Sequence, residues 1–456
     1  MFKVRWSCIQ ALVALHALVL AAAVPSTASV RPVRTDDEAL APRMPRIPAL
    51  REQARTRDRW LRERLDTLVP RLMRERGVDM WVLVAREYAE DPVVATMLNA
   101  ESFHARRRTI LVFFDSGGGR SVERLTVSRY GLAGLFAPAW RPEAQPDQWR
   151  ALGELVAARR PKRIAVNVSA ASAFADGLTH SQHEALMTAL PEPYRARVVP
   201  ADELAIGWLE TRIPVEMAEY PRIVRVAHAI IGEALSSRVI KPGETTAADV
   251  QWWMRERVAT LGLQVWFHPS LHILRAGVAE ELQDDAVIRP GDMLWTDFGI
   301  MHMGLATDTQ HLAYVLRPGE RDAPAGLKAG LSGANRVQDA LAAAFRTGRS
   351  GNDILADARA SAIAAGLKPT IYSHPIGFHG HGAGAAIGFW DDQRPSPAGE
   401  RRLRTDTAWS VELSHTAAVP EWGGREVPFR LEEDAFFDGR SLRYLDGRQR
   451  TFHLIR

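Results

Sequence analysis

The sequence predicts two folded domains, an α/β domain followed by an α+β domain. The chain has 456 residues, which is more than one hydrophobic core normally organises. Over residues 51–205, strand-like apolar runs alternate with helical segments, a pattern typical of α/β folds. Over residues 213–456, two helical segments followed by strand-like runs occur twice, which indicates an α+β domain with an internal pseudo-twofold arrangement.

The first domain is expected to begin with an amphipathic helix over residues 50–76, because Leu61, Leu65 and Leu68 recur at helical spacing. Strands are predicted at residues 80–84, 109–114 and 163–166, and a helix at 149–159. Three glycines at 117–119 separate two strand-like runs, and no Gly-Lys-Ser/Thr sequence follows them. We therefore expect a hairpin loop there rather than a phosphate-binding loop.

The second domain is expected to open with helices over residues 215–239 and 245–261. Pro242 and Gly243 favour an end to the first, and Thr245 or Thr246 can cap the second. A further helical region covers residues 326–366 with an interruption near 348–351, and mainly strand-like runs follow it.

Residues 1–28 have the composition of a secretory signal peptide. Lys3 and Arg5 precede an apolar run over about residues 9–24, and the small residues Ser26 and Ala28 follow. The run is shorter than the roughly 20 apolar residues that a membrane span needs, so a retained anchor is the weaker alternative. Residues 29–50 are interpreted as a linker. We expect an exported protein, in a bacterial periplasm or secreted, with no stable membrane insertion after signal removal.

Composition excludes several kinds of chemistry. The single cysteine, Cys8, lies in the predicted signal peptide, so the mature chain would have no disulfide, no cysteine nucleophile and no Cys-ligated zinc. The formal net charge is only +4, and arginine runs such as residues 106–108 are interleaved with acidic and apolar residues. Nucleic acid is therefore not expected as a partner.

Two aspartates lie on neighbouring strand-like runs, residues 294–299 and 305–310, joined by a short turn. If the hairpin is centred between His302 and Met303, Asp297 and Asp308 are directly opposite each other and share a face. Two carboxylates at that spacing repel each other unless cations or shared protons lie between them. Taken alone, turn aspartates or helix caps remain the simpler interpretation.

Three histidines, His374, His379 and His381, occur within eight residues among glycines that allow close backbone approach. Such a cluster favours a metal or proton-transfer site over packing alone. Glu412 and Glu432 each lie in an apolar strand-like run, where a buried acid needs a cation or hydrogen bonds. Either could instead be an exposed strand carboxylate.

Together, four carboxylates and one neutral imidazole carry a formal charge of −4, which two divalent cations balance. A donor set rich in oxygen favours hard or borderline ions, so we expect manganese, with cobalt or zinc as alternatives.

These residues resemble the pita-bread metallopeptidases, the family of methionine aminopeptidase, aminopeptidase P (Xaa-Pro aminopeptidase) and prolidase. The aspartates are eleven residues apart (308 − 297), as in that family's motif, and the His-x-x-Gly-x-x-x-His pattern occurs as His374, Gly377 and His381. The resemblance implies a creatinase-like N-terminal domain over 51–205 and a pita-bread catalytic domain over 213–456. It also implies two metal ions held by Asp297, Asp308, His374, Glu412 and Glu432.

The resemblance implies further roles outside the ligand set. His381 matches a histidine that contacts the substrate carbonyl, and His272 matches an upstream substrate histidine, although His268 is close by. Arg430 resembles an arginine of the aminopeptidase P and prolidase branch, and with His379 is assigned to substrate binding. The sequence around the second histidine departs from the usual acid-containing stretch, so the imidazole ligand stays open among His374, His379 and His381.

The function that the resemblance implies is removal of the N-terminal residue from short peptides, with proline at the second position and Glu412 as general base. A prolidase-type dipeptidase is the nearest alternative, and a homo-oligomer is compatible with the family. Two rival hypotheses are a metal-free hydrolase, as in creatinase, and a non-catalytic binding protein. Both are disfavoured because all five ligand positions are intact. Neither Gly-x-Ser-x-Gly nor His-Glu-x-x-His is present, which disfavours serine hydrolases and single-zinc proteases.

Overall fold

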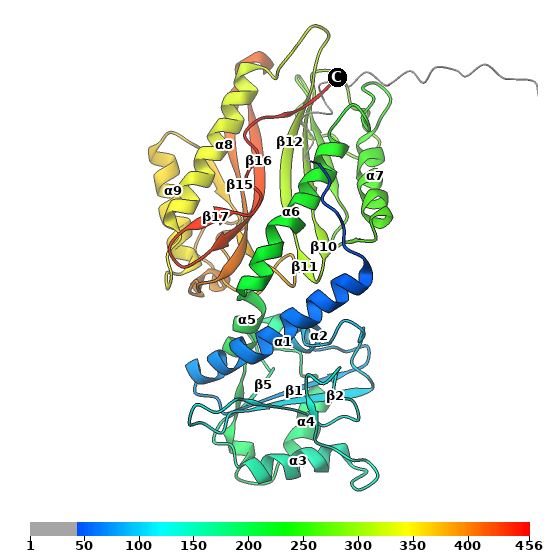
Figure 1. Cartoon of the computed structure of the whole chain (residues 1–456). Helices are drawn as coiled ribbons and strands as arrows, with labels where there is room; N and C mark the ends of the chain where they lie inside the picture. The colour runs from blue at the N-terminus through cyan, green and yellow to red at the C-terminus, as the bar shows by residue number, and fades with distance from the viewer. Residues whose placement is uncertain (1–42) are drawn as a thin grey trace, which may run out of the picture.

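The computed structural model describes residues 43–456 as two stacked domains, each built around a β-sheet (Figure 1). The predicted signal peptide, residues 1–28, and most of the predicted linker, residues 29–50, lie outside the described residues. Met44 and Ile47, at the end of that linker, pack against the core of the C-terminal domain. Within residues 43–456, none of the helices has the length and apolar character to span a bilayer.

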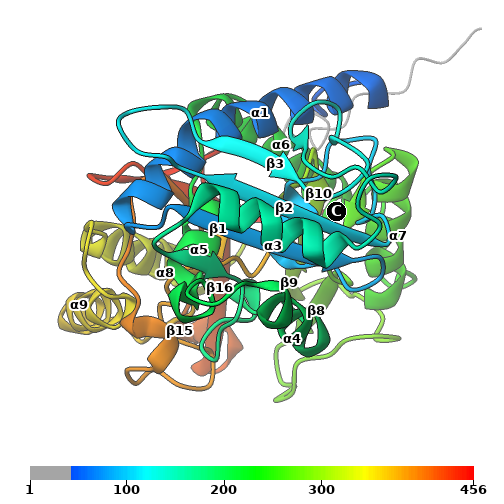
Figure 2. The same cartoon turned by 90° about the horizontal axis from the view of Figure 1, so that it is seen from below.

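The N-terminal domain is a six-stranded sheet with helices on both faces, which confirms the predicted α/β class. Its strand order is β4-β3-β2-β1-β5-β6. The strands are β1 (Met80–Arg86), β2 (Arg108–Phe114), β3 (Glu123–Thr126), β4 (Ala137–Pro138), β5 (Ile164–Val166) and β6 (Val198–Pro200). One face is covered by α1 (Leu50–Glu75), α2 (Pro92–Thr96) and α5 (Asp202–Glu210), and the other by α3 (Gln148–Arg159) and α4 (His180–Ala189) (Figure 2).

Alternation along β1 explains why both faces of this sheet are covered. Trp81 and Leu83 point into the core under α1 and α5, whereas Val82 and Val84 point into the core under α3. The glycines at 117–119 all have positive φ and join antiparallel β2 and β3, as predicted for a hairpin loop. Because α5 packs in the same core as α1, this domain continues past residue 205 to the end of α5.

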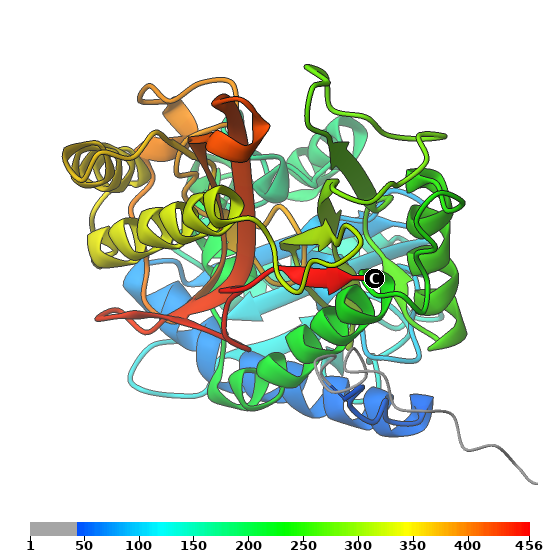
Figure 3. The same cartoon turned by 90° about the horizontal axis from the view of Figure 1, so that it is seen from above.

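The C-terminal domain is a nine-stranded sheet with two helix pairs on its outer face (Figures 1 and 3). The main path is β13-β15-β16-β12-β9-β8, with β14, β17 and β18 attached to it. Its strands are β8 (Ser270–Leu274), β9 (Met293–Phe298), β12 (Thr309–Val315), β13 (Pro369–Ile371), β14 (His374–Ile376), β15 (Thr407–Val419), β16 (Arg425–Phe437), β17 (Leu442–Tyr444) and β18 (His453–Ile455). A small sheet adds β7 (Gln264–Val265), β10 (Ile300–His302) and β11 (Leu305–Ala306).

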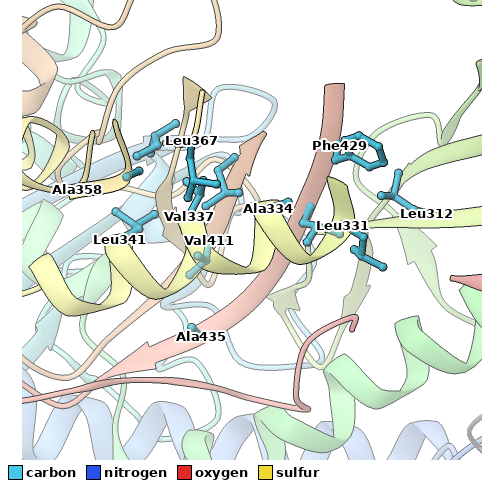
Figure 4. Packing of buried hydrophobic residues seen from close by; sticks show 14 of the residues in the cluster. Leu312, Leu331, Ala334, Val337, Leu341, Ala358, Leu367, Val411, Phe429 and Ala435 are labelled. Atoms are coloured by element: carbon cyan, nitrogen blue, oxygen red, sulfur yellow. The ribbon is translucent and has the colours of Figure 1, made fainter. Parts of the chain in front are cut away.

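The helix pairs reproduce the predicted repeat of two helices and strands. One pair, α6 (Pro214–Ala234) and α7 (Ala247–Thr260), packs on β8, β9 and β12, and the other, α8 (Ala325–Ala344) and α9 (Gly351–Ala364), packs on β15 and β16. Figure 4 shows this second core, where Leu331 and Val337 of α8 lie over Val411 and Phe429. Gly330 allows the close approach, because an added Cβ would lie 2.1 Å from the Phe429 ring. Within residues 43–456, both helix pairs thus pack on the outer face of this sheet.

The first catalytic-domain helix is shorter than predicted, and the second is capped as predicted. Helix α6 ends at Ala234 rather than near residue 239, because Ser236 donates its hydroxyl to the Glu233 carbonyl and a turn follows. Thr246 caps α7 by accepting a hydrogen bond from the Asp249 backbone N–H at 3.1 Å.

A buried arginine joins the two domains. Arg64 of α1 is 1% exposed, and its Nη1 lies 3.0 Å from Glu216 Oε2 in the first turn of α6 and 2.8 Å from the Thr211 carbonyl oxygen. Its guanidinium also lies over the rings of Trp208 and Phe378, at 4.5 and 4.8 Å from their centroids. The arginine therefore links the N-terminal domain both to α6 and to the segment that holds the three histidines.

Replacing this arginine should weaken the whole assembly. Arg64→Ala would leave the buried Glu216 carboxylate with Arg212, at 3.7 Å, as its cationic partner. We therefore expect the free energy of unfolding to fall by ~3 kcal/mol. The measurement is urea unfolding followed by tryptophan fluorescence. Arg62→Ala, on the exposed side of the same helix, is the control and should unfold at the unaltered midpoint. Equal midpoints for both variants would contradict a stabilising role for Arg64.

Candidate functional site

Strand register places a row of polar side chains across the inner face of the C-terminal sheet. Glu412 on β15 is directly opposite Glu432 on β16, and Glu432 is opposite Gln310 on β12. Gln310 is opposite Asp297 on β9, which in turn is opposite Ser270 on β8. Directly paired residues share a face, so this one row brings three of the predicted ligands to the same level of the sheet.

The predicted pairing of the two aspartates is wrong, although they still come together. The turn lies at Met303 and Gly304, both with positive φ (52° and 80°), rather than between His302 and Met303. A two-residue turn of this kind matches the strand twist and moves the register by two residues. Asp297 is therefore opposite Gln310, and Asp308, two residues earlier, lies diagonally across on the same face.

His374 completes the group from β14, which pairs with β15 beside Ser410. Its Nε2 lies 3.7 Å from Asp308 Oδ2, 3.8 Å from Glu412 Oε2 and 3.8 Å from Glu432 Oε1. Its Nδ1 lies 3.1 Å from the Pro375 carbonyl oxygen, to which it can donate only as N–H. This contact fixes the tautomer and leaves the Nε2 lone pair directed at the carboxylates.

Burial controls the protonation of these groups. It raises the pKa of Asp297 to about 7 and that of Glu412 to about 8. Burial, together with the neighbouring carboxylates, also holds the pKa values of Asp308 and Glu432 well above their usual range. Burial and then His381 lower the pKa of His374 to about 3, so this imidazole is neutral. Without cations, several of these acids therefore hold protons at neutral pH.

The group fits divalent cations by a second criterion, which is the atoms that it leaves without hydrogen bonds. Asp297 Oδ1 and His374 Nε2 are buried and have no hydrogen-bond partner within the described residues. Ligand atoms of Asp297, Asp308 and Glu432 lie within 4.8 Å of one another, as do those of His374, Glu412 and Glu432. Two overlapping sets that share Glu432 suit a pair of ions in which this carboxylate is common to both.

Comparison with known proteins agrees with this geometry. Residues 222–435, which include all five predicted ligands, match the family model of Metallopeptidase family M24. The chain carries an M24 metallopeptidase domain. The prediction of a pita-bread metallopeptidase is thus confirmed for this domain, and M24 is a metal-dependent peptidase family.

Solved structures similar to this peptidase cover both of its domains. An X-Pro aminopeptidase from Thermotoga maritima is 15% identical, with a TM-score of 0.61, and the match covers 84% of this chain and 99% of that one. An Xaa-Pro dipeptidase from Bacillus anthracis is 16% identical, with a TM-score of 0.57, over 90% and 100% of the two chains. An Escherichia coli aminopeptidase P variant is 12% identical, with a TM-score of 0.55, over 88% and 96%. No curated protein sequence matched the chain.

The other predicted site residues of the peptidase lie in three different places. His381 lies beside the ligand group, with its ring 4.7 Å from that of His374 and perpendicular to it. His272 and Arg430 meet at Glu281, at 3.4 and 2.8 Å, on the same face of the sheet as the acidic row. The ring of His379 instead lies 4.8 Å from Phe174 of the N-terminal domain.

The glycines of the histidine segment work as predicted. A Cβ at Gly380 would lie 2.3 Å from the Trp266 ring, so glycine lets this loop close over that indole. Trp266 is fixed by donating from Nε1 to the Thr307 carbonyl oxygen at 2.9 Å, and its ring lies 5.2 Å from that of His381. The loop and the aspartate hairpin therefore position His381 together.

A large cavity between the domains reaches the ligand group. It has a volume of about 1260 Å³ and is bordered by His374 and His381. Tyr372 and Phe389 line it from the catalytic domain, and Phe174 lines it from the N-terminal domain. His379 borders a separate, smaller cavity instead. Substrate would therefore approach the acids through a space whose walls come from both domains.

Several residues that support the centre were not anticipated from the sequence. Gln310 and Trp390 both donate hydrogen bonds to Glu412 Oε1, at 2.6 and 2.8 Å, and Ser410 donates to Glu432. Trp295 Nε1 donates to Gln310 Oε1 at 3.0 Å and so orients the amide. Gln310 could have been found, because it follows Asp308 at strand period two, whereas Trp390 comes from an irregular loop.

The metal-free protein should become less stable as the pH rises. The folded-state pKa values of Asp297 and Glu412, about 7 and about 8, exceed their unfolded values near 4. Each group therefore binds more protons in the folded state than in the unfolded state. Its contribution to the free energy of unfolding is complete at acid pH and is lost as the pH rises towards 8. Thermal unfolding in excess chelator at about pH 5 and about pH 8 measures this difference.

Two controls accompany that measurement. Asp297→Asn should flatten the dependence, and saturating manganese should restore stability at the higher pH because metal binding requires deprotonated ligands. A melting temperature that is equal at both pH values in chelator would show that the acids are not held protonated by burial.

Proposed function

We propose that the protein is a dinuclear aminopeptidase that removes the N-terminal residue of short peptides, with preference for proline at the second position. The observation that carries this proposal is the set of four carboxyl groups and one neutral imidazole that meet on one sheet face beside a cavity between the domains. Asp297, Asp308, His374, Glu412 and Glu432 would hold two divalent ions, manganese in the first place and cobalt or zinc as alternatives.

The bound ions would supply a lowered water pKa and polarisation of the scissile carbonyl. Glu412 is the general base in this scheme. Gln310 and Trp390 hold its Oε1, so the carboxylate has a fixed orientation when it takes a proton from the attacking water and passes it to the leaving amine. Because Trp295 holds Gln310 in turn, the base is oriented through a chain of hydrogen bonds rather than by packing alone.

His381 is placed to donate a hydrogen bond to the carbonyl oxygen as negative charge develops there. Burial lowers its pKa, so the ring is neutral near pH 7 and offers one N–H. Trp266 and His374 border its ring on two sides. His272 and Arg430, tied together by Glu281, form a second polar group further along the same face and are proposed to contact the substrate.

The size of the cavity favours an aminopeptidase over a strict dipeptidase. A space of about 1260 Å³ exceeds the usual range for small-ligand pockets, and a dipeptide would leave much of it unfilled. A metal-free hydrolase or a non-catalytic binding protein is disfavoured by the retention of all four acids. We also propose export of the protein, on the basis of its N-terminal sequence.

Glu412→Gln should abolish most turnover. The amide keeps the size of the side chain but cannot accept the proton, so we expect kcat to fall by about 10²–10⁴-fold. The assay is release of the N-terminal residue from an Xaa-Pro tripeptide with manganese present, and Glu421→Gln, on the surface of the same domain, is the control. Undiminished turnover in Glu412→Gln would rule out this base.

Substrate length separates the two peptidase hypotheses. With manganese present, an Xaa-Pro tripeptide should be cleaved with a higher kcat/KM than the matching Xaa-Pro dipeptide, because only the longer peptide uses the full cavity. Activity should disappear in chelator and return with manganese or cobalt. Cleavage of the dipeptide alone would support the prolidase-type alternative instead, and hydrolysis that persists after complete metal removal would contradict both.

A further inference from the structure

A second cluster of metal-binding residues lies on the opposite face of the same strands. Glu433 follows Glu432 on β16, and His311 follows Gln310 on β12, so both side chains point away from the acidic row. They meet His228, which comes from the sheet-facing side of α6. All three residues are buried, and none has a role in the proposed peptidase chemistry.

The three side chains surround a common point. His228 Nε2 lies 3.1 Å from Glu433 Oε2, and His311 Nε2 lies 3.1 Å from Glu433 Oε1. The two imidazole rings are 5.2 Å apart at their centroids. One ligand atom from each residue lies within 4.8 Å of the others. Two imidazole nitrogens and one carboxylate are a donor set that single zinc ions use in proteins.

The Nδ1 atom of each histidine has a hydrogen-bond partner, as is usual for histidines that bind metal through Nε2. Asp446 Oδ2 lies 3.1 Å from His228 Nδ1, and His453 Nε2 lies 3.2 Å from His311 Nδ1. A hydrogen bond to the outer nitrogen fixes the ring and leaves Nε2 to face the ion. Asp446 is also paired with Arg225 at 2.6 Å, so the buried Glu433 carboxylate is the charge that a cation at this point would offset if the three imidazoles are neutral.

One side of the cluster is open. A cavity of about 550 Å³ is lined by the three residues and by the C-terminal segment 446–454. In Figures 1 and 3 this segment, coloured red, passes between α8 and α6 on its way to the C-terminus. A water molecule could therefore occupy a fourth position next to the three protein ligands.

We propose that His228, His311 and Glu433 bind a single divalent cation, zinc or another ion of borderline softness, at a site separate from the acidic centre. The ion would join α6, β12 and β16, and through Asp446 and His453 it would secure the C-terminal segment. The competing state is a metal-free network, in which a proton on His228 holds the same groups together. The two states differ in metal content, which makes the proposal testable.

The test uses the full mature chain, from which metal is first removed with a chelator. The protein is then titrated with zinc, and bound zinc is measured by elemental analysis. A parallel titration with cobalt is followed by visible absorption. The unaltered protein should bind one equivalent more than His228→Gln or His311→Gln. Cobalt in a four-coordinate site with nitrogen ligands absorbs visible light strongly, and this band should vanish in both variants. Asp446→Asn leaves all three ligands in place and should weaken zinc binding by about 10–100-fold. Asp322→Asn, on the wall of the same cavity but 56% exposed, is the matched control and should bind like the unaltered protein.

A double variant, Asp297→Asn with Asp308→Asn, separates this site from the acidic centre. This double variant should still bind the one equivalent of zinc that is lost in His228→Gln. That result is expected whether or not the protein proves to be a dinuclear peptidase. Zinc content and cobalt absorption that are the same in His228→Gln, His311→Gln and the unaltered protein would overturn the proposal. Binding by Asp446→Asn that equals that of Asp322→Asn would do the same.

Discussion

Repulsion among buried carboxyl groups is the constraint on which the architecture of this protein depends. The pairing of β15, β16, β12 and β9 puts Glu412, Glu432 and Asp297 in one row, and Asp308 lies diagonally beside Asp297. In a buried setting these groups cannot all be ionised unless cations lie among them. The scaffold nevertheless holds them there, with His374 kept neutral and directed at three of the four acids. Local destabilisation of this kind is typical of a functional site, and here it indicates a site for metal ions.

The rest of the molecule keeps that row in position and controls access to it. Both helix pairs lie on the outer face of the sheet, so the inner face stays open to the cavity between the domains. The N-terminal domain closes this cavity from the other side, and Arg64 fixes it to α6 and to the histidine segment at once. Alternation along β16 adds a second consequence. Glu432 belongs to the inner row, while the next residue, Glu433, meets His228 and His311 on the outer face, so one strand contributes to two possible metal sites.

Much of this could be predicted from the sequence, because the deciding signals are local. Apolar periodicity located most helices and strands, and the spacing of acids and histidines pointed to the five residues that the structure brings together. The register of the aspartate hairpin could not be predicted, since it depends on the positive φ of Met303, a residue that rarely starts such a turn. Trp390 and Glu281 reach the site from irregular segments, and the cluster around His228 joins residues more than 200 positions apart. Such contacts follow only from the assembled fold.

The five ligand residues are proposed to hold two metal ions side by side. The most direct measurement is anomalous diffraction from crystals of the protein grown with manganese, recorded at the manganese edge. We expect two anomalous peaks, about 3.5–4 Å apart, among Asp297, Asp308, His374, Glu412 and Glu432. Crystals that contain manganese but show no peak at these residues, or only one at full occupancy, would contradict a dinuclear centre.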